Sequence, residues 1–235
     1  MKTKILVSLT TLDNPDWQRN LADLKRFGIK EFAIFPNCIN SREERMELFE
    51  SVIRELGQVS IPFSHIRADM HPDEIDFMVK NFNTKAVNIH PTSEWPTTYD
   101  LSNYKDIIYV ENAGPAFWNG LTDKDIEGFA GVCLDLSHLE SVRLQKVAGY
   151  DVNINISKKY KIGANHMSAM TDKLTEVPQY NSATYDNHYL SDLKEMDYIK
   201  QYYPKYFGPY AAIELKNSIE DQIKIKDYVE KMLFS

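Results

Sequence analysis

Six residues of metal-binding type lie at or near the ends of short apolar runs: His65, His90, Glu111, Asp135, His166 and Glu214. Imidazole and carboxylate groups in combination suit Zn2+, Mn2+ or Fe2+ better than Mg2+ or Ca2+. Each residue taken alone is more often a capping or solvated group. If the fold gathers all six, metal ions would resolve the repulsion and the unsatisfied polar atoms of such a cluster. The pattern therefore predicts a divalent-metal centre.

Local motifs around these positions add further candidates. Pro91 ends the run directly after His90, and Gly114 permits a tight turn three residues after Glu111. Two pairs have a spacing that suits ligands: Asp135 with His138, and Asp186 with His188. Each pair alone is common by chance. Together with the strand ends they extend the candidate ligands to His138, Asp186 and His188.

The candidate ligands depend on elements that repeat along the chain. Eight short apolar, β-rich runs cover residues 5–10, 31–35, 61–66, 86–90, 107–111, 131–135, 162–166 and 210–215. Such runs are typical of parallel strands buried on both faces. Amphipathic helical patterns lie between most of them, over residues 16–27, 41–56, 72–82, 139–147 and 218–233. The alternation predicts a parallel α/β architecture.

A closed (β/α)8 TIM barrel explains this repeat best. The runs begin roughly 21 to 30 residues apart until the seventh, close to the unit size of a barrel of roughly 250 residues. The gap between the last two runs is longer and must hold an extended loop or an extra helix. An open doubly wound sheet is the competing fold, but no Gly-x-Gly-x-x-Gly follows any strand. We expect one domain over residues 1–235, with the carboxyl ends of all strands on one face.

Composition excludes several classes of protein. The net charge of −7 argues against a strongly basic nucleic-acid surface. The two cysteines, Cys38 and Cys133, cannot form a disulfide framework and indicate a reducing compartment. The apolar run near the N-terminus is too short for a signal peptide, and no stretch is long enough to span a membrane. We therefore expect a cytoplasmic protein without a membrane partner.

The segments 89–91, 111–114 and 131–138 resemble the endonuclease IV family (AP endonuclease family 2), within the xylose-isomerase-like TIM barrels. The resemblance covers nearly the whole chain in strand order. It implies up to three metal ions, usually Zn2+, and hydrolysis of a phosphodiester 5′ to an abasic site in DNA. The chain departs from the family after His166, where Met-Ser-Ala-Met replaces Asn-Asp-Ser, and after Glu214, where Leu-Lys replaces Thr-Pro.

Carried over residue by residue, the resemblance implies three ligand groups: His65, His90 and Glu111; Glu111, Asp135, His166 and Glu214; and His138, Asp186 and His188. Glu111 would bridge two of the ions. Glu111 or Glu214 is then the candidate catalytic residue that orients a metal-activated hydroxide. Mn2+ or Fe2+ are the alternatives to zinc.

Residues for substrate contact are less distinct. Four cations are candidates for phosphate contact, although solvated surface charge explains each of them more simply: Arg42, Arg67, Arg143 and Lys216. Four aromatic residues are candidates either for stacking on a base or sugar or for packing over the site: Trp95, Tyr99, Phe117 and Trp118. His71 lies at a helix start and is interpreted as structural.

Two enzymatic hypotheses remain open, and a non-catalytic metal-binding barrel is a third. The first is a phosphoesterase that acts on a phosphodiester, with abasic DNA as one candidate. The second is a sugar or sugar-phosphate isomerase or epimerase, which needs a single metal at Glu111, Asp135, His166 and Glu214. Such an isomerase needs neither His65 nor the group at His138, Asp186 and His188, and this favours the phosphoesterase. The sequence leaves the substrate, the metal and the oligomeric state undetermined.

Overall fold

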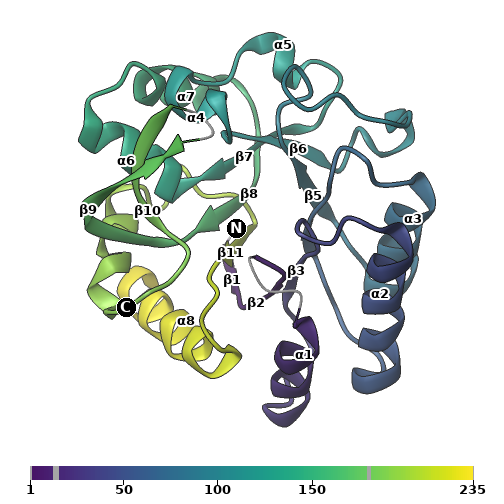
Figure 1. Ribbon diagram of the computed structural model, residues 1–235. Coiled ribbons are helices and arrows are strands. Elements are labelled where there is room, and N and C mark those ends of the chain that lie inside the picture. The colour runs from purple at the N-terminus through teal and green to yellow at the C-terminus, as the bar shows by residue number, and fades with distance from the viewer. Residues whose placement is uncertain (1, 13–15, 179–180, 235) are drawn as a thin grey trace.

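The computed structural model describes residues 2–12, 16–178 and 181–234. Parallel strands form the wall of a barrel, and helices pack around its outside (Figure 1). The first run is broken at Val7 into β1 (Lys4–Leu6) and β2 (Ser8–Thr10). β1 pairs with β11 (Tyr210–Ile213), and β2 pairs with β3 (Ala33–Phe35). The broken first strand therefore links the two edges of the sheet.

All eight predicted apolar runs contain strands of this barrel, which confirms the predicted fold. The other wall strands are β4 (Phe63–His65), β5 (Ala86–Ile89), β6 (Ile108–Glu111), β7 (Gly131–Asp135) and β8 (Ile162–Met167). Every neighbouring pair around the sheet is parallel. The carboxyl ends of these strands consequently open to one face.

Large side chains fill the barrel interior. Phe35 and Phe63 meet edge to face with their ring centroids 5.8 Å apart. Phe35 also stacks on the ring of His166 at 4.8 Å. Aromatic pairs in such geometries add about 0.5–1.5 kcal/mol beyond their buried area. The packed barrel interior thus contacts one of the predicted ligands, His166, directly.

The outer layer contains the predicted helices and three more. The predicted ones are α1 (Trp17–Arg26), α2 (Arg42–Leu56), α3 (Pro72–Phe82), α6 (Leu136–Gln145) and α8 (Ile219–Phe234). The additional ones are α4 (Pro115–Asn119), α5 (Asp123–Ile126) and α7 (Gly149–Lys159), and a short 3-10 helix, η1, covers Ser102–Tyr104.

His71 caps α3 by accepting a hydrogen bond from the backbone N–H of Asp73, which agrees with the structural role inferred for it from the sequence.

The long segment between β8 and β11 forms an antiparallel hairpin and a 3-10 helix. The hairpin consists of β9 (Ala169–Val177) and β10 (Ser182–Asn187), and the helix, η3, covers Leu193–Gln201. Sequence patterning predicted only an extended loop or an extra helix here. Most hairpin side chains are partly or fully exposed, so the strands lack the apolar alternation by which a strand is recognised. The hairpin lies beside α6 in Figure 1.

No helix in the described parts of the chain combines the length and the apolar character that crossing a membrane requires.

Candidate metal centre

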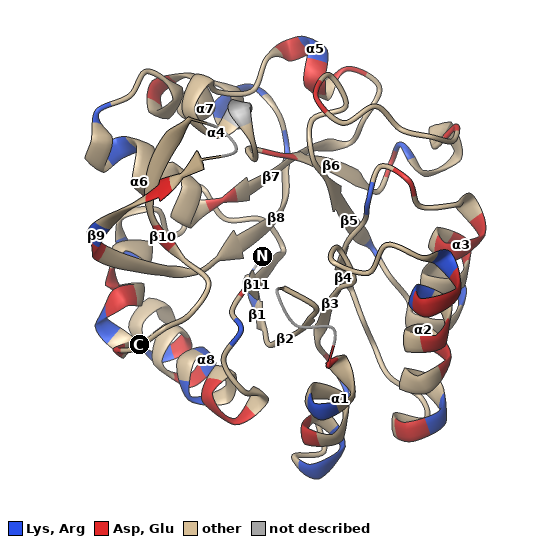
Figure 2. Cartoon of the chain, in the orientation of Figure 1, with Lys and Arg blue, Asp and Glu red and all other residues tan. Residues whose placement is uncertain are grey.

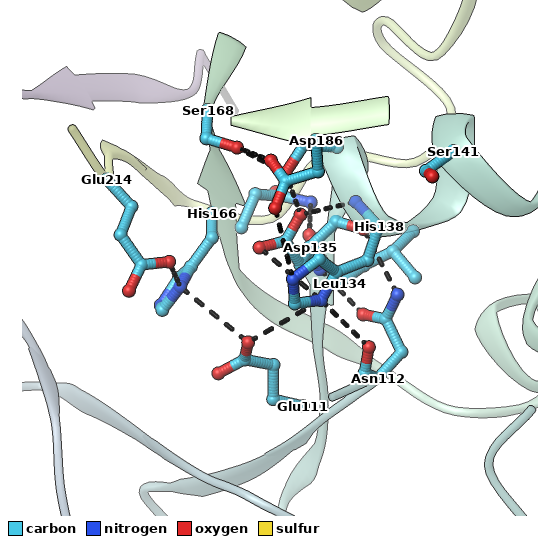
Figure 3. Close-up of polar contacts among 12 residues, drawn as sticks. Glu111, Asn112, Leu134, Asp135, His138, Ser141, His166, Ser168, Asp186 and Glu214 are labelled. Carbon is cyan, nitrogen blue, oxygen red and sulfur yellow. Dashed lines mark hydrogen bonds and ion pairs between the residues drawn. The ribbon is translucent and has the colours of Figure 1, made fainter. Parts of the chain in front are cut away.

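The nine predicted ligands all belong to the carboxyl-terminal face of the barrel or to the segments that border it. Three are the last residues of their strands (His65, Glu111 and Asp135), His166 lies in β8, two directly follow a strand (His90 and Glu214), and three lie in α6 or the hairpin region (His138, Asp186 and His188). Figure 3 shows six of them converging: Glu111, Asp135, His138, His166, Asp186 and Glu214.

Glu111 forms a compact group with two histidines. Nε2 of His65 lies 3.1 Å from Nε2 of His90 and 3.3 Å from Oε2 of Glu111. Nε2 of His90 lies 3.9 Å from the same oxygen. The three ligand atoms lie within 4.8 Å of one another, a separation that one metal ion can span.

A second group shares Glu111. It consists of Glu111, Asp135, His166 and Glu214, all of which are buried and have ligand atoms within 4.8 Å of one another. Nδ1 of His166 lies 2.6 Å from Oε2 of Glu214 and 3.9 Å from Oε1 of Glu111. The two oxygens of Glu111 therefore face different imidazole groups, as a bridging carboxylate requires.

The remaining three candidates meet at one carboxylate oxygen. Nε2 of His138 and Nε2 of His188 each lie 3.8 Å from Oδ2 of Asp186. His138 comes from α6, whereas Asp186 belongs to β10 and His188 follows that strand. The hairpin therefore completes a third group that no single local motif contains. This group is looser than the first two, because its ligand atoms do not all lie within 4.8 Å of one another.

Several imidazole rings are held in the tautomer that a metal ligand needs. Three of them contact a backbone carbonyl oxygen through Nδ1 at 3.0 Å: His65 with Ile66, His138 with Asn112, and His188 with Glu214. A carbonyl oxygen can only accept a hydrogen bond, so Nδ1 carries the proton. Each Nε2 can then offer its lone pair to the cluster, the arrangement usual for metal-binding histidines.

Asp135 provides a direct test of whether these residues suit a cation. Its Oδ1 accepts hydrogen bonds from the Ser137 hydroxyl (2.5 Å) and from the backbone N–H of His138 (2.9 Å). Its Oδ2 is buried and has no hydrogen-bond partner among the described residues. A buried carboxylate oxygen without a donor is costly, and a bound cation would remove this cost. The donor set and this oxygen both fit a divalent metal.

The charged groups also shift one another's pKa. Burial raises the pKa of the Glu214 carboxyl, but the imidazoles of His166 and His188 outweigh burial and lower the pKa to about 2. Burial lowers the pKa of His138, but the carboxylates of Asp135 and Asp186 outweigh burial and raise the pKa to about 9. The carboxylates thus favour positive charge in the cluster. Protonated imidazoles supply this charge when no metal ion is bound.

Two adjoining cavities open above the cluster. One has a volume of about 370 Å³, and its walls include Glu111, Asp186 and Glu214. The other has a volume of about 450 Å³, and it shares Asn37 and His90 with the first. A small substrate can therefore reach the cluster from either side.

The predicted aromatic residues differ in their positions. Trp95 lines the larger cavity and packs against His90 with centroids 4.9 Å apart. Phe117 and Trp118 line the smaller cavity, and Phe117 packs against His138 at 4.8 Å. Tyr99 instead packs against the ring of His71 and lines neither cavity. Three of the four are thus in position to contact a ligand.

Carboxylates engage most of the predicted phosphate-binding cations. Arg42 lies 3.5 Å from Asp73, Arg67 contacts Asp69 at 2.7 Å, and Arg143 contacts Glu140 at 2.7 Å through two nitrogens. Of these four cations, only Arg67 and Lys216 line the two cavities. Figure 2 shows acidic and basic residues mixed along the outer helices. Surface ion pairs account for Arg42 and Arg143.

Sequence analysis missed the polar residues that surround the ligands. Asn88 donates a hydrogen bond to Oε2 of Glu111, and its Oδ1 lies 3.2 Å from Nε2 of His166. Asn88 lies two residues before His90, so strand alternation could have placed both on one face. Ser137 lies inside the segment 131–138 but was not singled out there, and Ser168 follows β8 where the chain departs from the family pattern.

Comparison with known proteins shows the class of fold. No known protein-family model matches the sequence, and no curated protein matches it. A xylose isomerase-like TIM barrel protein from Mycobacterium smegmatis, solved in complex with magnesium, has a TM-score of 0.51 at 15% identity, covering 99% of this chain and 100% of that one. A xylose isomerase-like TIM barrel/4-hydroxyphenylpyruvate dioxygenase fusion protein has a TM-score of 0.52 at 13% identity over 99% of this chain. This chain spans 43% of that fusion protein.

The fold is therefore a TIM barrel similar to those of these two xylose isomerase-like proteins. Sequence identities this low show only that the folds are similar. The narrower resemblance to endonuclease IV remains a hypothesis from the sequence motifs.

Proposed function

We propose that the chain is a divalent-metal-dependent phosphoesterase that hydrolyses a phosphodiester at the cluster around Glu111. The observation that carries the proposal is that two possible metal-ligand groups and a third, looser group of ligand-type residues lie at one barrel face. Glu111 belongs to two of them, and Asp186 connects His138 with His188 in the third. A multinuclear centre of this kind suits displacement at phosphorus, where two oxygens develop charge.

The proposed ligands are the nine residues of the three groups, with Zn2+ as the preferred ion and Mn2+ or Fe2+ as alternatives. Divalent ions would supply a water of lowered pKa and positive charge beside the phosphoryl oxygens. Glu111 and Glu214 are the proposed catalytic residues because their carboxylates line the cavity where a phosphodiester would bind. They would accept hydrogen bonds from the attacking water and so hold its oxygen in line with phosphorus.

The reaction consumes one water molecule for each ester bond. The water oxygen forms a new bond to phosphorus, and the bond between phosphorus and the leaving alcohol oxygen breaks. One proton of the water ends on the leaving alkoxide, and the other ends on the new phosphomonoester or in solvent. No covalent enzyme intermediate is needed, which agrees with the burial of Cys133.

Sugar or sugar-phosphate isomerisation or epimerisation is the second candidate. The specific observation in its favour is that Glu111, Asp135, His166 and Glu214 form a four-ligand buried group by themselves. In that reaction two carboxylates would move a proton beside a polarised carbonyl group. The group at Asp186 would then have no role in the chemistry.

Metal content separates the two candidates. The protein is purified without chelator, and its metal is measured per chain by elemental analysis. About three ions per chain support the phosphoesterase, whereas about one supports the isomerase. Activity is then assayed on a phosphodiester, including abasic-site DNA, and on a panel of ketoses. Turnover of a ketose without phosphodiester hydrolysis would overturn the proposal.

A further inference from the structure

Two buried serine hydroxyls connect the second ligand group to the third. The Ser137 hydroxyl donates to Oδ1 of Asp135 at 2.5 Å. Oγ of Ser168 lies 2.8 Å from Oγ of Ser137, whose own hydrogen is already donated to Asp135. Oγ of Ser168 also contacts Oδ1 of Asp186 (Figure 3), so Ser168 shares its single hydroxyl hydrogen between two acceptors. An unbroken chain of contacts therefore runs from Asp135 to Asp186 through two side chains.

This chain of contacts lies in the interior of the protein. Ser137, Ser168 and Asp135 are fully buried, and the side chain of Asp186 is 7% exposed. Hydrogen bonds to charged groups contribute about 1.5–3 kcal/mol, and a buried polar group that loses its partner costs a similar amount. Both serines are therefore expected to hold their carboxylates firmly.

The contacts determine which carboxylate oxygen faces the ligand groups. In Asp135 the serine occupies Oδ1, and Oδ2 is the oxygen without a hydrogen-bond partner. In Asp186 the serine occupies Oδ1, and Oδ2 lies 3.8 Å from the nitrogens of His138 and His188. Both aspartates thus use one oxygen for a serine and direct the other at imidazoles or at the cluster.

Ser168 lies at the point where the barrel wall becomes the hairpin. It separates β8 from β9, and its backbone carbonyl accepts a hydrogen bond from the hydroxyl of Tyr198 at 3.0 Å. Asp186 is on the returning strand, β10. The position of the hairpin and the orientation of Asp186 consequently depend on the same short segment.

We propose that Ser137 and Ser168 are positioning residues that form a hydroxyl bridge between Asp135 and Asp186 and thereby couple the second metal site to the third. The inference rests on the proposed metal centre but goes beyond its ligands. The bridge makes the geometry of each aspartate depend on the other. Loss of either serine then weakens binding at both sites, and most strongly at the third, because Asp135 keeps its bond from the backbone N–H of His138.

A double-mutant cycle measures this coupling. Ser137→Ala, Ser168→Ala and the double variant are stripped of metal and titrated with Zn2+ by calorimetry. We expect Ser168→Ala to weaken the third ion by about 10- to 100-fold, the range for residues that orient metal ligands. The double variant should cost little more than Ser168→Ala alone, because one missing hydroxyl already breaks the bridge. Additive effects would overturn the coupling.

Ser141→Ala is the matched control. Ser141 is also a buried serine of α6, and it contacts the hairpin through the hydroxyl of Thr184 (3.0 Å) and the backbone N–H of Tyr185 (2.9 Å). No hydrogen bond connects its side chain to a proposed ligand in the described structure. Its replacement should leave zinc affinity within about 3-fold of the wild type. An equal loss in Ser141→Ala and Ser168→Ala would show that only hairpin anchoring matters, and this would overturn the proposal.

Further measurements separate misfolding and failure of the proposed function from failure of this inference. Ser168→Cys keeps a small polar side chain at the same position and should recover part of the affinity. Co2+ absorption spectra report ligand geometry independently of catalysis, and Ser168→Ala should alter them.

Three ions on the wild type with unchanged binding in both serine variants would overturn this inference alone. Fewer than three ions on the wild type would leave no third site to couple and would overturn this inference, and fewer than two would overturn the multinuclear centre as well.

Discussion

Nε2 of His65 lies 3.3 Å from Oε2 of Glu111, although the two residues end strands that are separated by a third. The other oxygen of Glu111 lies 3.9 Å from Nδ1 of His166. Glu111 is therefore the residue common to the first two metal-ligand groups. This shared position is the reason that the proposed centre contains more than one ion, and the following predictions test it and its surroundings.

His188→Ala tests the third ligand group. The variant should lose about one of three ions, and phosphodiesterase activity should fall by at least roughly 10- to 100-fold, because only the third group uses this ligand. Glu214→Gln should abolish activity under either candidate function, because both place this carboxylate on the central metal. Both residues lie at the barrel mouth, so the circular-dichroism spectrum should not change. Unaltered metal content and activity in His188→Ala would contradict a functional third site.

A duplex containing an abasic site tests DNA as the substrate. Binding to DNA releases counterions from neutralised phosphates, so any cleavage should fall steeply as salt is raised. With Arg67 and Lys216 as the cations in the cavity walls, we expect a small phosphodiester to be hydrolysed with much weaker salt dependence. Rates are measured for both substrates with zinc or manganese across a salt series. No cleavage of the duplex at low salt would remove DNA from consideration.

Asn112→Ala tests how the ligand-bearing ends of β6 and β7 are held together. The Asn112 side chain accepts a hydrogen bond from the backbone N–H of Asp135 (2.7 Å) and donates one to its carbonyl oxygen (3.1 Å). All these groups are buried, so truncation should lower the free energy of unfolding by about 2–4 kcal/mol. Urea denaturation measures the change. The exposed Asn155→Ala should change stability by less than about 0.5 kcal/mol, and equal effects would contradict the assignment.

Arg45→Ala tests a buried ion pair that joins α2 to α3. The Arg45 guanidinium contacts both oxygens of Glu74, at 2.6 and 3.0 Å, and the side chains are 2% and 0% exposed. Removal of the cation leaves a buried carboxylate unpaired and should cost about 3–5 kcal/mol. Arg54→Ala on the same helix removes an exposed pair with Glu47 and should cost about 1 kcal/mol or less. Thermal and chemical unfolding measure the two stability losses. Comparable losses in Arg45→Ala and Arg54→Ala would contradict a stabilising role for the buried pair.

Thiol labelling tests the interior of the barrel. Cys133 is fully buried, and burial raises the pKa of its thiol to about 12, whereas Cys38 is exposed. A disulfide reagent at neutral pH should therefore modify one thiol per native chain and two after denaturation. The released chromophore is counted by absorbance. Rapid reaction of both thiols in the native protein would show that the barrel interior opens readily.

The sequence by itself determined the barrel and the placement of most proposed ligands along it. Short apolar runs identified the eight strands. Proposed ligands at or near the end of a run, such as Glu111 and Asp135, could be predicted without knowledge of any tertiary contact. This was possible because parallel strands have a shared direction. Any residue at a carboxyl end must face the same opening once the sheet closes.

Tertiary structure alone decided how the proposed ligands group and what orients them. The hairpin that carries Asp186 has mostly exposed or partly exposed side chains and no apolar pattern, so its approach to His138 could not be predicted. The contact between Ser137 and Ser168 joins positions 31 residues apart, and neither residue has a propensity that marks it. Hydrophobic periodicity records which face of an element is buried, whereas the pairing of polar atoms depends on how those elements pack.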